Sequence, residues 1–193
     1  MRRVLLLPVP VMVVLLLAAA ACRRTYTPKP HGYFRIAFPE KKYVRYEGPC
    51  PYTFEYPVYA RVVKDREPEA EPCWLNIEFP AFHGRLHLTY KDVGDQLGRL
   101  LEDTYSLAYK HTVKADAIHE RAFADTAAGV YGILYDIRGN AASNVQFYLT
   151  DSTRHYLRGA LYFDLVPEKD SLAPVIRFIR EDIVHMIETF SWK

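Results

Sequence analysis

Cysteine, glycine and clusters of one charge are scarce in this sequence. Its 193 residues include three cysteines and nine glycines, and the formal net charge is +2 at neutral pH. No phosphate-binding glycine loop, G-x-S-x-G elbow or H-E-x-x-H signature occurs. No basic stripe is present either, so nothing points to nucleic acid. These absences leave no signature of a P-loop protein, a serine hydrolase or a zinc protease.

Long apolar runs are limited to the N-terminus. Residues 4–17 are almost wholly apolar and follow Arg2 and Arg3. A membrane-spanning helix needs about 20 apolar residues, whereas this run gives way to small residues and then to Cys22. The layout is that of a secretory signal. The three alanines before Cys22 resemble the site where a bacterial peptidase cuts beside a lipid-bearing cysteine, although Leu is more common at the first of them.

Two other interpretations of this segment stay open: a signal peptide cut near Ala21 with Cys22 unmodified, and a retained membrane helix. On the lipoprotein interpretation, acyl chains on Cys22 hold the mature chain on a membrane. The chain is then divided into a signal peptide, a lipidated tether and a single globular domain, over residues 1–21, 22–32 and 33–193.

A pair of cysteines, Cys50 and Cys73, remains if Cys22 carries lipid. Disulfides persist in the oxidising compartments to which a secretory signal leads. We therefore expect these two residues to pair, which stabilises a chain by about 3 kcal/mol for a loop of this size. Two buried free thiols are the alternative. A metal site is disfavoured because no third or fourth ligand stands at zinc-like spacing.

The apolar pattern predicts an α+β domain in which a central antiparallel sheet is flanked by helices. Helical spacing indicates one helix that follows Asp92 as its cap, with Asp95 in a capping-box position. It indicates a second over residues 171–190, capped by Asp170 or Ser171. The strand candidates are residues 33–38, 43–46, 52–56 with a continuation at 59–63, 74–79, 85–90, 118–123, 129–137, 145–150 and 156–163.

The second half of the domain has the pattern of an antiparallel meander with two unlike faces. Val145, Phe147 and Leu149 alternate on one face, where apolar residues of the next strand can meet them, so we expect this face in the core. The other face is too polar for a dry interior and too aromatic for a plain solvent surface. It carries Gln146, Tyr148, Thr150, Tyr156, Arg158 and Tyr162.

Polar turns stand at both ends of the strand 145–150. Side chains in such turns can hydrogen-bond their own backbone, which accounts for them as hairpin connections. Alternatively, the turns and the tyrosine-bearing face form docking surfaces, because Tyr and Arg are favoured in interface cores. Since the turns lie at opposite ends of one strand, two separate patches are expected. The candidate partner-binding residues are Asn140, Ser143, Asn144, Tyr148, Asp151, Arg154, Tyr156 and Tyr162.

The histidines do not predict a metal site. His83 and His87 are four residues apart, which on a strand is about 13 Å and too far to share an ion. His185 stands beside Glu181 and Asp182 at helical spacing, where contacts between side chains are common. We expect no catalytic residue, no metal and no cofactor.

Several segments resemble the GldD family of gliding motility lipoproteins. The longest is GNAASNVQFYLTDSTRHYLRGALYF, at residues 139–163. Shorter ones are CPY at 50–52, FEYP at 54–57, CWLNI at 73–77 and HLTYK at 87–91. The resemblance covers nearly all of the mature chain. It implies lipidation at Cys22 and partners among the envelope proteins that support gliding motility and type IX protein secretion. The element order is also similar to the α/β/α sandwich of Mog1 and PsbP proteins.

Three functions remain open. The favoured one is a non-enzymatic docking or assembly factor that supports the gliding and secretion complex. The second is an envelope hydrolase with an unrecognised site, which predicts sensitivity to changes such as Asp151→Asn or His155→Ala. The third is a periplasmic small-ligand-binding module of Mog1/PsbP-like fold, which requires a large enclosed apolar cavity.

The basic residues Arg23 and Arg24 favour an orientation toward the periplasm. Surface-exported lipoproteins of the bacteria that have this gliding machinery tend instead to carry acidic residues after the cysteine. The inner leaflet of the outer membrane is then preferred over the inner membrane as the site of the anchor.

Overall fold

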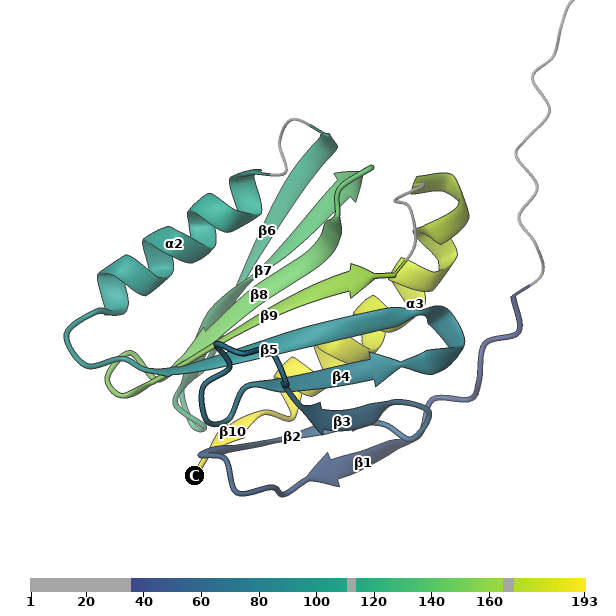
Figure 1. Cartoon of the computed structure of the whole chain (residues 1–193). Helices are drawn as coiled ribbons and strands as arrows, with labels where there is room; N and C mark the ends of the chain where they lie inside the picture. Colours follow the sequence, from purple (N-terminus) through teal and green to yellow (C-terminus); the bar gives the residue numbers. More distant parts are fainter. Residues whose placement is uncertain (1–35, 111–113, 165–168) are drawn as a thin grey trace, which may run out of the picture. The chain divides into compact units, whose positions relative to one another are not determined.

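The computed structural model describes residues 36–110, 114–164 and 169–193. Within these ranges the chain forms two antiparallel sheets and two helices (Figure 1). The strands are β1 Tyr43–Tyr46, β2 Tyr52–Pro57, β3 Arg61–Lys64, β4 Leu75–Phe79, β5 Gly84–Asp92, β6 Ala115–Asp125, β7 Val130–Gly139, β8 Ser143–Thr150, β9 His155–Phe163 and β10 Ser191–Trp192. The helices are α2 Leu97–Tyr109 and α3 Lys169–Glu188, and a 3₁₀ turn, η1, covers Pro80–Phe82.

The large sheet has the strand order β3-β4-β5-β9-β8-β7-β6 in the described part of the chain. Its second half is the predicted meander. Leu149 lies opposite Leu157, and Phe147 lies opposite Gly159. The expected α+β fold with a central antiparallel sheet and flanking helices is confirmed. The smaller sheet, β1-β2-β10, was not expected, because the short strand β10 follows the second helix.

The core lies between α3 and one face of the large sheet, called here the inner face. As predicted, Val145, Phe147 and Leu149 are buried on it, together with Leu157 and Leu161 of β9. The apolar stripe of α3 packs against these residues, because its buried side chains recur at helical spacing. This stripe consists of Leu172, Val175, Ile179, Ile183, Met186 and Ile187.

The opposite, outer face of the large sheet is covered by α2 over β6, β7, β8 and the start of β9 (Figure 1). Ala108 of α2 packs with Tyr135 and Ile137 of β7. The hydroxyl groups of Thr104 and Tyr156 hydrogen-bond to each other, which joins α2 to β9. The two helices therefore lie on opposite faces, and α2 leaves the outer face over β4 and β5 uncovered.

Several local predictions were wrong. Asp92 is not a helix cap, because it ends β5, and α2 begins at Leu97 without a side-chain cap. Asp95 accordingly precedes the helix and forms no capping box. The Asp92 carboxylate instead accepts a hydrogen bond from the backbone N–H of Gly94 at 3.3 Å. Gly94 has a φ of 46°, a conformation that glycine adopts without strain.

Other differences concern the element ends. The segment after Pro57 does not continue β2, because a turn closed by the hydrogen bond from Ala60 N–H to Pro57 O (2.9 Å) delivers β3 to the large sheet. Residues 36–38 form no strand, and the rest of the predicted strand 33–38 lies outside the described residues. The second helix begins at Lys169, so Asp170 and Ser171 lie in its first turn. Cys22 and the predicted signal peptide and tether also lie outside the described residues.

Candidate functional site

The candidate partner-binding residues fall into two groups at opposite ends of β8, as expected from the two turns. Ser143 lies opposite Tyr162 at the end where β8 begins, and Thr150 lies opposite Tyr156 at the other end. At the first end, Asn140 and Tyr162 are exposed. At the second end, Arg154 is exposed and Asp151 is half-buried.

Three of the candidates are buried within the domain and do not offer their side chains to a partner. Ser143 is 0% exposed, Tyr156 2% and Asn144 8%. The Asn144 amide donates to the carbonyl oxygens of Ile137 (2.9 Å) and Gly139 (3.2 Å), so it holds the β7–β8 turn. Burial is also the first cause that raises the pKa of Tyr156 to about 12. For Ser143 and Asn144 a role in the β7–β8 hairpin accounts for the geometry, whereas Tyr156 joins β9 to α2.

Asp151 holds the β8–β9 turn. Its carboxylate accepts hydrogen bonds from the backbone N–H groups of Thr153 (2.9 Å), Arg154 (2.8 Å) and His155 (2.8 Å). Burial raises the pKa of the Asp151 carboxyl, but these N–H groups outweigh burial and lower the pKa to about 2. This arrangement is an Asx-type turn, as one of the two interpretations of the sequence expected.

The uncovered outer face forms a polar face, defined here by Asn76 and Glu78 of β4, Arg85 and His87 of β5, and Arg158 and Tyr162 of β9. Strand register brings these residues together: Glu78 lies opposite Arg85, and Arg85 lies opposite Tyr162. The His87 and Tyr162 rings meet edge to face, with centroids 5.6 Å apart. Tyr162 is thus the candidate residue that the structure places on the polar face with its side chain exposed.

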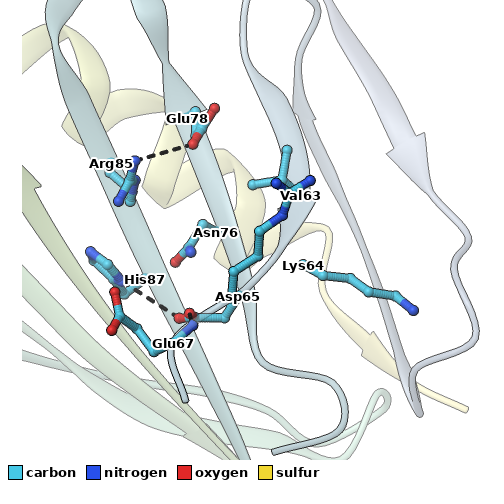
Figure 2. Close-up of a pocket in the computed structure, with 9 residues that line it drawn as sticks. Val63, Lys64, Asp65, Glu67, Asn76, Glu78, Arg85 and His87 are labelled. Atoms are coloured by element: carbon cyan, nitrogen blue, oxygen red, sulfur yellow. Dashed lines mark hydrogen bonds and ion pairs between the residues drawn. The ribbon is translucent and has the colours of Figure 1, made fainter. Parts of the chain in front are cut away.

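A hollow of about 370 Å³ opens on the polar face between β4, β5 and the loop that follows β3 (Figure 2). Arg85 donates to Glu78 at 3.2 Å, and His87 Nδ1 lies 3.9 Å from Asp65 Oδ2. Figure 2 shows both pairs on the walls of the hollow, with Asn76 between them. Carboxylates and guanidinium groups alternate here, so the hollow suits a polar or zwitterionic group better than an apolar one.

His87 is held toward its neutral form. Burial lowers its pKa, and the positive charge of Arg85 lowers it further, while Asp65 acts in the opposite direction. Because its folded-state pKa lies below the ordinary value, protonation of His87 weakens the fold as the pH falls through that range. At neutral pH, His87 therefore presents an uncharged ring with one donor and one acceptor nitrogen.

Unused hydrogen-bonding capacity gathers on the outer face. Among the described residues, four of its buried polar atoms have no hydrogen-bond partner: Asn76 Oδ1, Arg85 Nε, Gln146 Nε2 and Arg158 Nε. Asn76 is only 6% exposed and also lines the hollow. A buried polar atom without a partner costs about 1–3 kcal/mol. Buried polar atoms are normally paired in native proteins, so this gathering of unpaired atoms distinguishes the outer face from the inner one.

A second hollow, of about 610 Å³, lies between α3 and the inner-face side of β6 and β7. We call it the basic cleft. Its lining includes Arg138, Arg177, Arg180, Asp116, Asp136 and His119, with Val145, Ala173 and Ile176 as apolar floor. Both hollows are open and carry several charged side chains, whereas the small-ligand hypothesis requires an enclosed apolar cavity.

Sequence reasoning missed most of the polar face. His87 was considered only as a metal ligand, and Asn76, Glu78 and Arg85 were not considered as site residues. The signal was present, because alternation along the predicted strands 74–79 and 85–90 puts these four side chains on one face. The contribution of the loop after β3 could not be predicted, since it depends on how that loop folds back over the sheet.

The described residues hold no group of three or more His, Cys, Asp or Glu side chains arranged to bind a metal ion. Over the same part of the chain, neither helix has the length and apolar character that crossing a membrane requires.

Comparisons with known proteins place the chain in a family. The family model described as gliding motility lipoprotein GldD matches residues 23–192. A search of curated proteins finds no match. Among solved structures, the chain is similar to cyanobacterial PsbP (CyanoP) from Synechocystis sp. PCC 6803, with 13% identity and a TM-score of 0.49 over 83% of this chain and 98% of that one. Because the family match spans nearly the whole chain, this protein belongs to the GldD family of gliding motility lipoproteins.

Proposed function

We propose that this lipoprotein is a non-enzymatic docking factor that supports gliding motility and type IX protein secretion. Membership of the family supports a lipid-anchored role in the envelope. The observation that carries the docking proposal is the polar face, where an exposed tyrosine borders buried polar atoms that have no partner in the described chain. The partner of the polar face is another envelope protein of the gliding and secretion machinery. The lipid on Cys22 attaches the protein to the membrane.

The anchor is a diacylglyceryl group on the sulfur of Cys22, inserted in the inner leaflet of the outer membrane. The folded domain then faces the periplasm. Two or more acyl chains give stable attachment to a bilayer. Mass spectrometry of the mature protein from its native membrane should show Cys22 as an acylated N-terminal residue. An unmodified N-terminus, or a chain that begins elsewhere, contradicts the anchor.

If the polar face docks on a partner, substitutions on this face should impair partner binding in cells. The double variant Arg85→Gln/Tyr162→Ala should reduce capture of the partner by photo-crosslinking in the envelope about tenfold or more, because buried aromatic and arginine anchors dominate interface energies. Surface spreading and adhesin secretion should fall with it. The unfolding midpoint of the purified variant shows that the fold is retained.

The matched control is Arg99→Gln/Tyr105→Ala on α2. Tyr105 is 50% exposed and the Arg99 side chain 77% exposed, so both are outward-facing residues of the same types. Normal spreading and secretion are expected for this variant. If the two double variants behave alike, the polar face is not the docking surface.

A further inference from the structure

The basic cleft lies at the end of the domain where the chain enters from its N-terminal side. Gly84, which begins β5, lies opposite Phe163, and Tyr162 lies opposite Ser143. The β4–β5 turn, the end of β9 and the β7–β8 turn therefore share one end of the large sheet (Figure 1). Phe38 packs at this end, with its ring centroid 5.8 Å from that of Phe82 and 4.5 Å from that of Phe178.

Two guanidinium groups of the basic cleft have no partner among the described residues. Arg180 is engaged, because Nη2 donates to Asp136 Oδ2 at 2.7 Å and Nε donates to the other carboxylate oxygen. This pair joins α3 to β7 and uses the negative charge of Asp136. Arg138 and Arg177 are exposed and line the same cleft. They are left without a counter-ion in the described chain.

The local backbone holds Arg138 in place. Gly139, the next residue, has a φ of 109°, and a Cβ at that position would come within 2.7 Å of Asp116 N and 2.8 Å of Lys114 O. Only glycine lets β7 pass this close to the start of β6. The Asn144 amide closes the same turn from β8. The cleft thus has a fixed rim, with arginines above an apolar floor.

We propose that the basic cleft binds the phosphate of an anionic phospholipid headgroup and so holds this end of the domain against the membrane that carries the anchor. Arginine donates to phosphate in a bidentate geometry and keeps its charge at any physiological pH. The apolar floor accepts the glycerol and upper acyl carbons. The inference shares with the proposed function only the lipid anchor at Cys22.

Chain length permits this contact. Residues 23–35 separate Cys22 from the first described residue, and an extended chain spans at most about 3.5 Å per residue, so the reach is about 45 Å. Phe38 follows this segment closely along the chain, so the end of the sheet that it shares with the basic cleft lies within reach of the bilayer. Basic side chains next to an anionic bilayer are attracted to it over about a Debye length.

Arginine-specific labelling tests the proposal on the intact lipidated protein. The mature chain is inserted in nanodiscs of phosphatidylcholine alone or with phosphatidylglycerol, treated with phenylglyoxal, and read by peptide mass spectrometry. Labelling of Arg138 and Arg177 should be slowed about thirtyfold in the anionic discs, since each of the two basic residues contributes about fivefold. About 0.5 M NaCl should remove most of this protection.

Controls within the same molecule are Arg99 on α2 and Arg154 in the β8–β9 turn, which are exposed and do not border the basic cleft. Their labelling should be the same in both kinds of disc. Equal protection of all four arginines, or protection of none, overturns the proposal. Millimolar glycerol phosphate in neutral discs separates the two sources of phosphate, because full protection by it assigns the cleft to a free anion and overturns the headgroup assignment. None of these measurements depends on partner capture. The headgroup proposal can therefore fail while the docking proposal holds, and the reverse.

Discussion

Replacement of Asp182 by Ala should lower the free energy of unfolding by about 3 kcal/mol, because it removes the acceptor of a buried ionic network. The Asp182 side chain is 1% exposed in the middle of α3. Its carboxylate accepts hydrogen bonds from Lys41 Nζ (2.8 Å), Tyr43 OH (2.9 Å) and Tyr59 OH (2.6 Å). Removal of the carboxylate leaves one ammonium and two phenol groups without this partner.

The network also fastens the start of the domain to α3. Lys41 lies over the Phe178 ring at 4.1 Å, and Tyr43 stacks on His185 with centroids 3.7 Å apart. Burial, followed by the hydrogen bond to Asp182, raises the pKa of both Tyr43 and Tyr59, so both phenols stay protonated as donors. Loss of the Asp182 carboxylate should therefore loosen the segment before β1 as well as lower the free energy of unfolding of the whole domain.

Urea unfolding followed by circular dichroism measures this effect. Asp182→Asn keeps the shape of the side chain but removes its charge. Its free energy of unfolding should lie between those of the wild type and the alanine variant. Glu181→Ala is the control, because the Glu181 side chain is 57% exposed and its ion pair with Lys41 spans 3.3 Å. Exposed pairs contribute about 0–1 kcal/mol. A change for Asp182→Ala no larger than that for Glu181→Ala would disprove the role assigned to the network.

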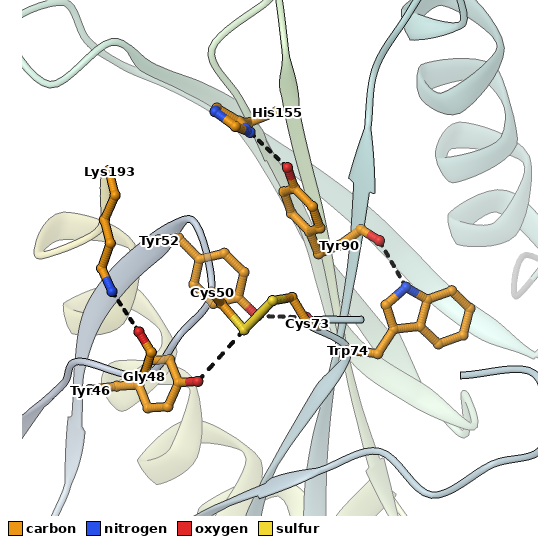
Figure 3. The surroundings of a disulfide bond; sticks show 9 residues. All are labelled: Tyr46, Gly48, Cys50, Tyr52, Cys73, Trp74, Tyr90, His155 and Lys193. Atoms are coloured by element: carbon orange, nitrogen blue, oxygen red, sulfur yellow. Dashed lines mark hydrogen bonds between the residues drawn. A yellow bond between two sulfur atoms is a disulfide. The ribbon is translucent and has the colours of Figure 1, made fainter. Parts of the chain in front are cut away.

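Removal of the disulfide should also cost about 3 kcal/mol, mainly through the entropy of the unfolded chain. Cys50 and Cys73 form the predicted bond, with Cα atoms 5.4 Å apart and a separation of 23 in sequence. It links the start of β2 to the loop before β4. Tyr52 OH donates to Cys73 O at 2.7 Å, and Trp74 Nε1 donates to Tyr90 O at 2.8 Å (Figure 3).

The disulfide also lies near the C-terminus. Lys193 N–H donates to Pro51 O at 3.0 Å. Lys193 Nζ donates to Gly48 O at 2.6 Å (Figure 3). Because β10 pairs with β2, loss of the bond between Cys50 and Cys73 should loosen β10 first. Trp192 stacks on His155 with centroids 5.1 Å apart, and Trp74 follows Cys73 in sequence, so the combined tryptophan fluorescence should change when the bond is lost.

The double variant Cys50→Ser/Cys73→Ser and reduction of the native protein by dithiothreitol should lower the urea midpoint by the same amount. The reductant should have no effect on the double variant, which controls for effects on other groups. A native protein whose midpoint is unchanged by complete reduction would show that the bond contributes nothing to stability.

The strands of the meander could be predicted because their signals are local. Alternation along residues 145–150 is set by the two-residue period of a strand, and the turn at Asp151 has its own hydrogen-bonding chemistry. The same reasoning failed at Asp92, where an acidic residue followed by apolar spacing has the appearance of a cap. The strand β5 continues through that position because it pairs with β9 as far as His155. Such pairing depends on residues far away in the chain.

The candidate site shows the same division. Tyr162 was identified from its strand, but its neighbours on the polar face come from β4 and β5, far earlier in the sequence. Ser143 and Tyr156 are of the residue types expected in a docking surface, yet they are buried. Tyr156 is buried because α2 covers this end of β9. Sequence patterns distinguish one face of a strand from the other, but they do not say which face a distant helix covers.

The sequence by itself determined the family, the strands of the meander, the inner face of the sheet and the cysteine pair, because each rests on residue identity or short-range periodicity. Tertiary structure alone decided the small sheet closed by β10, the buried position of Asp182, and which polar residues remain open on the outer face. The physical reason is that burial and pairing are properties of surfaces brought together from distant segments. Those surfaces exist only once α2 and α3 have packed on opposite faces of the large sheet.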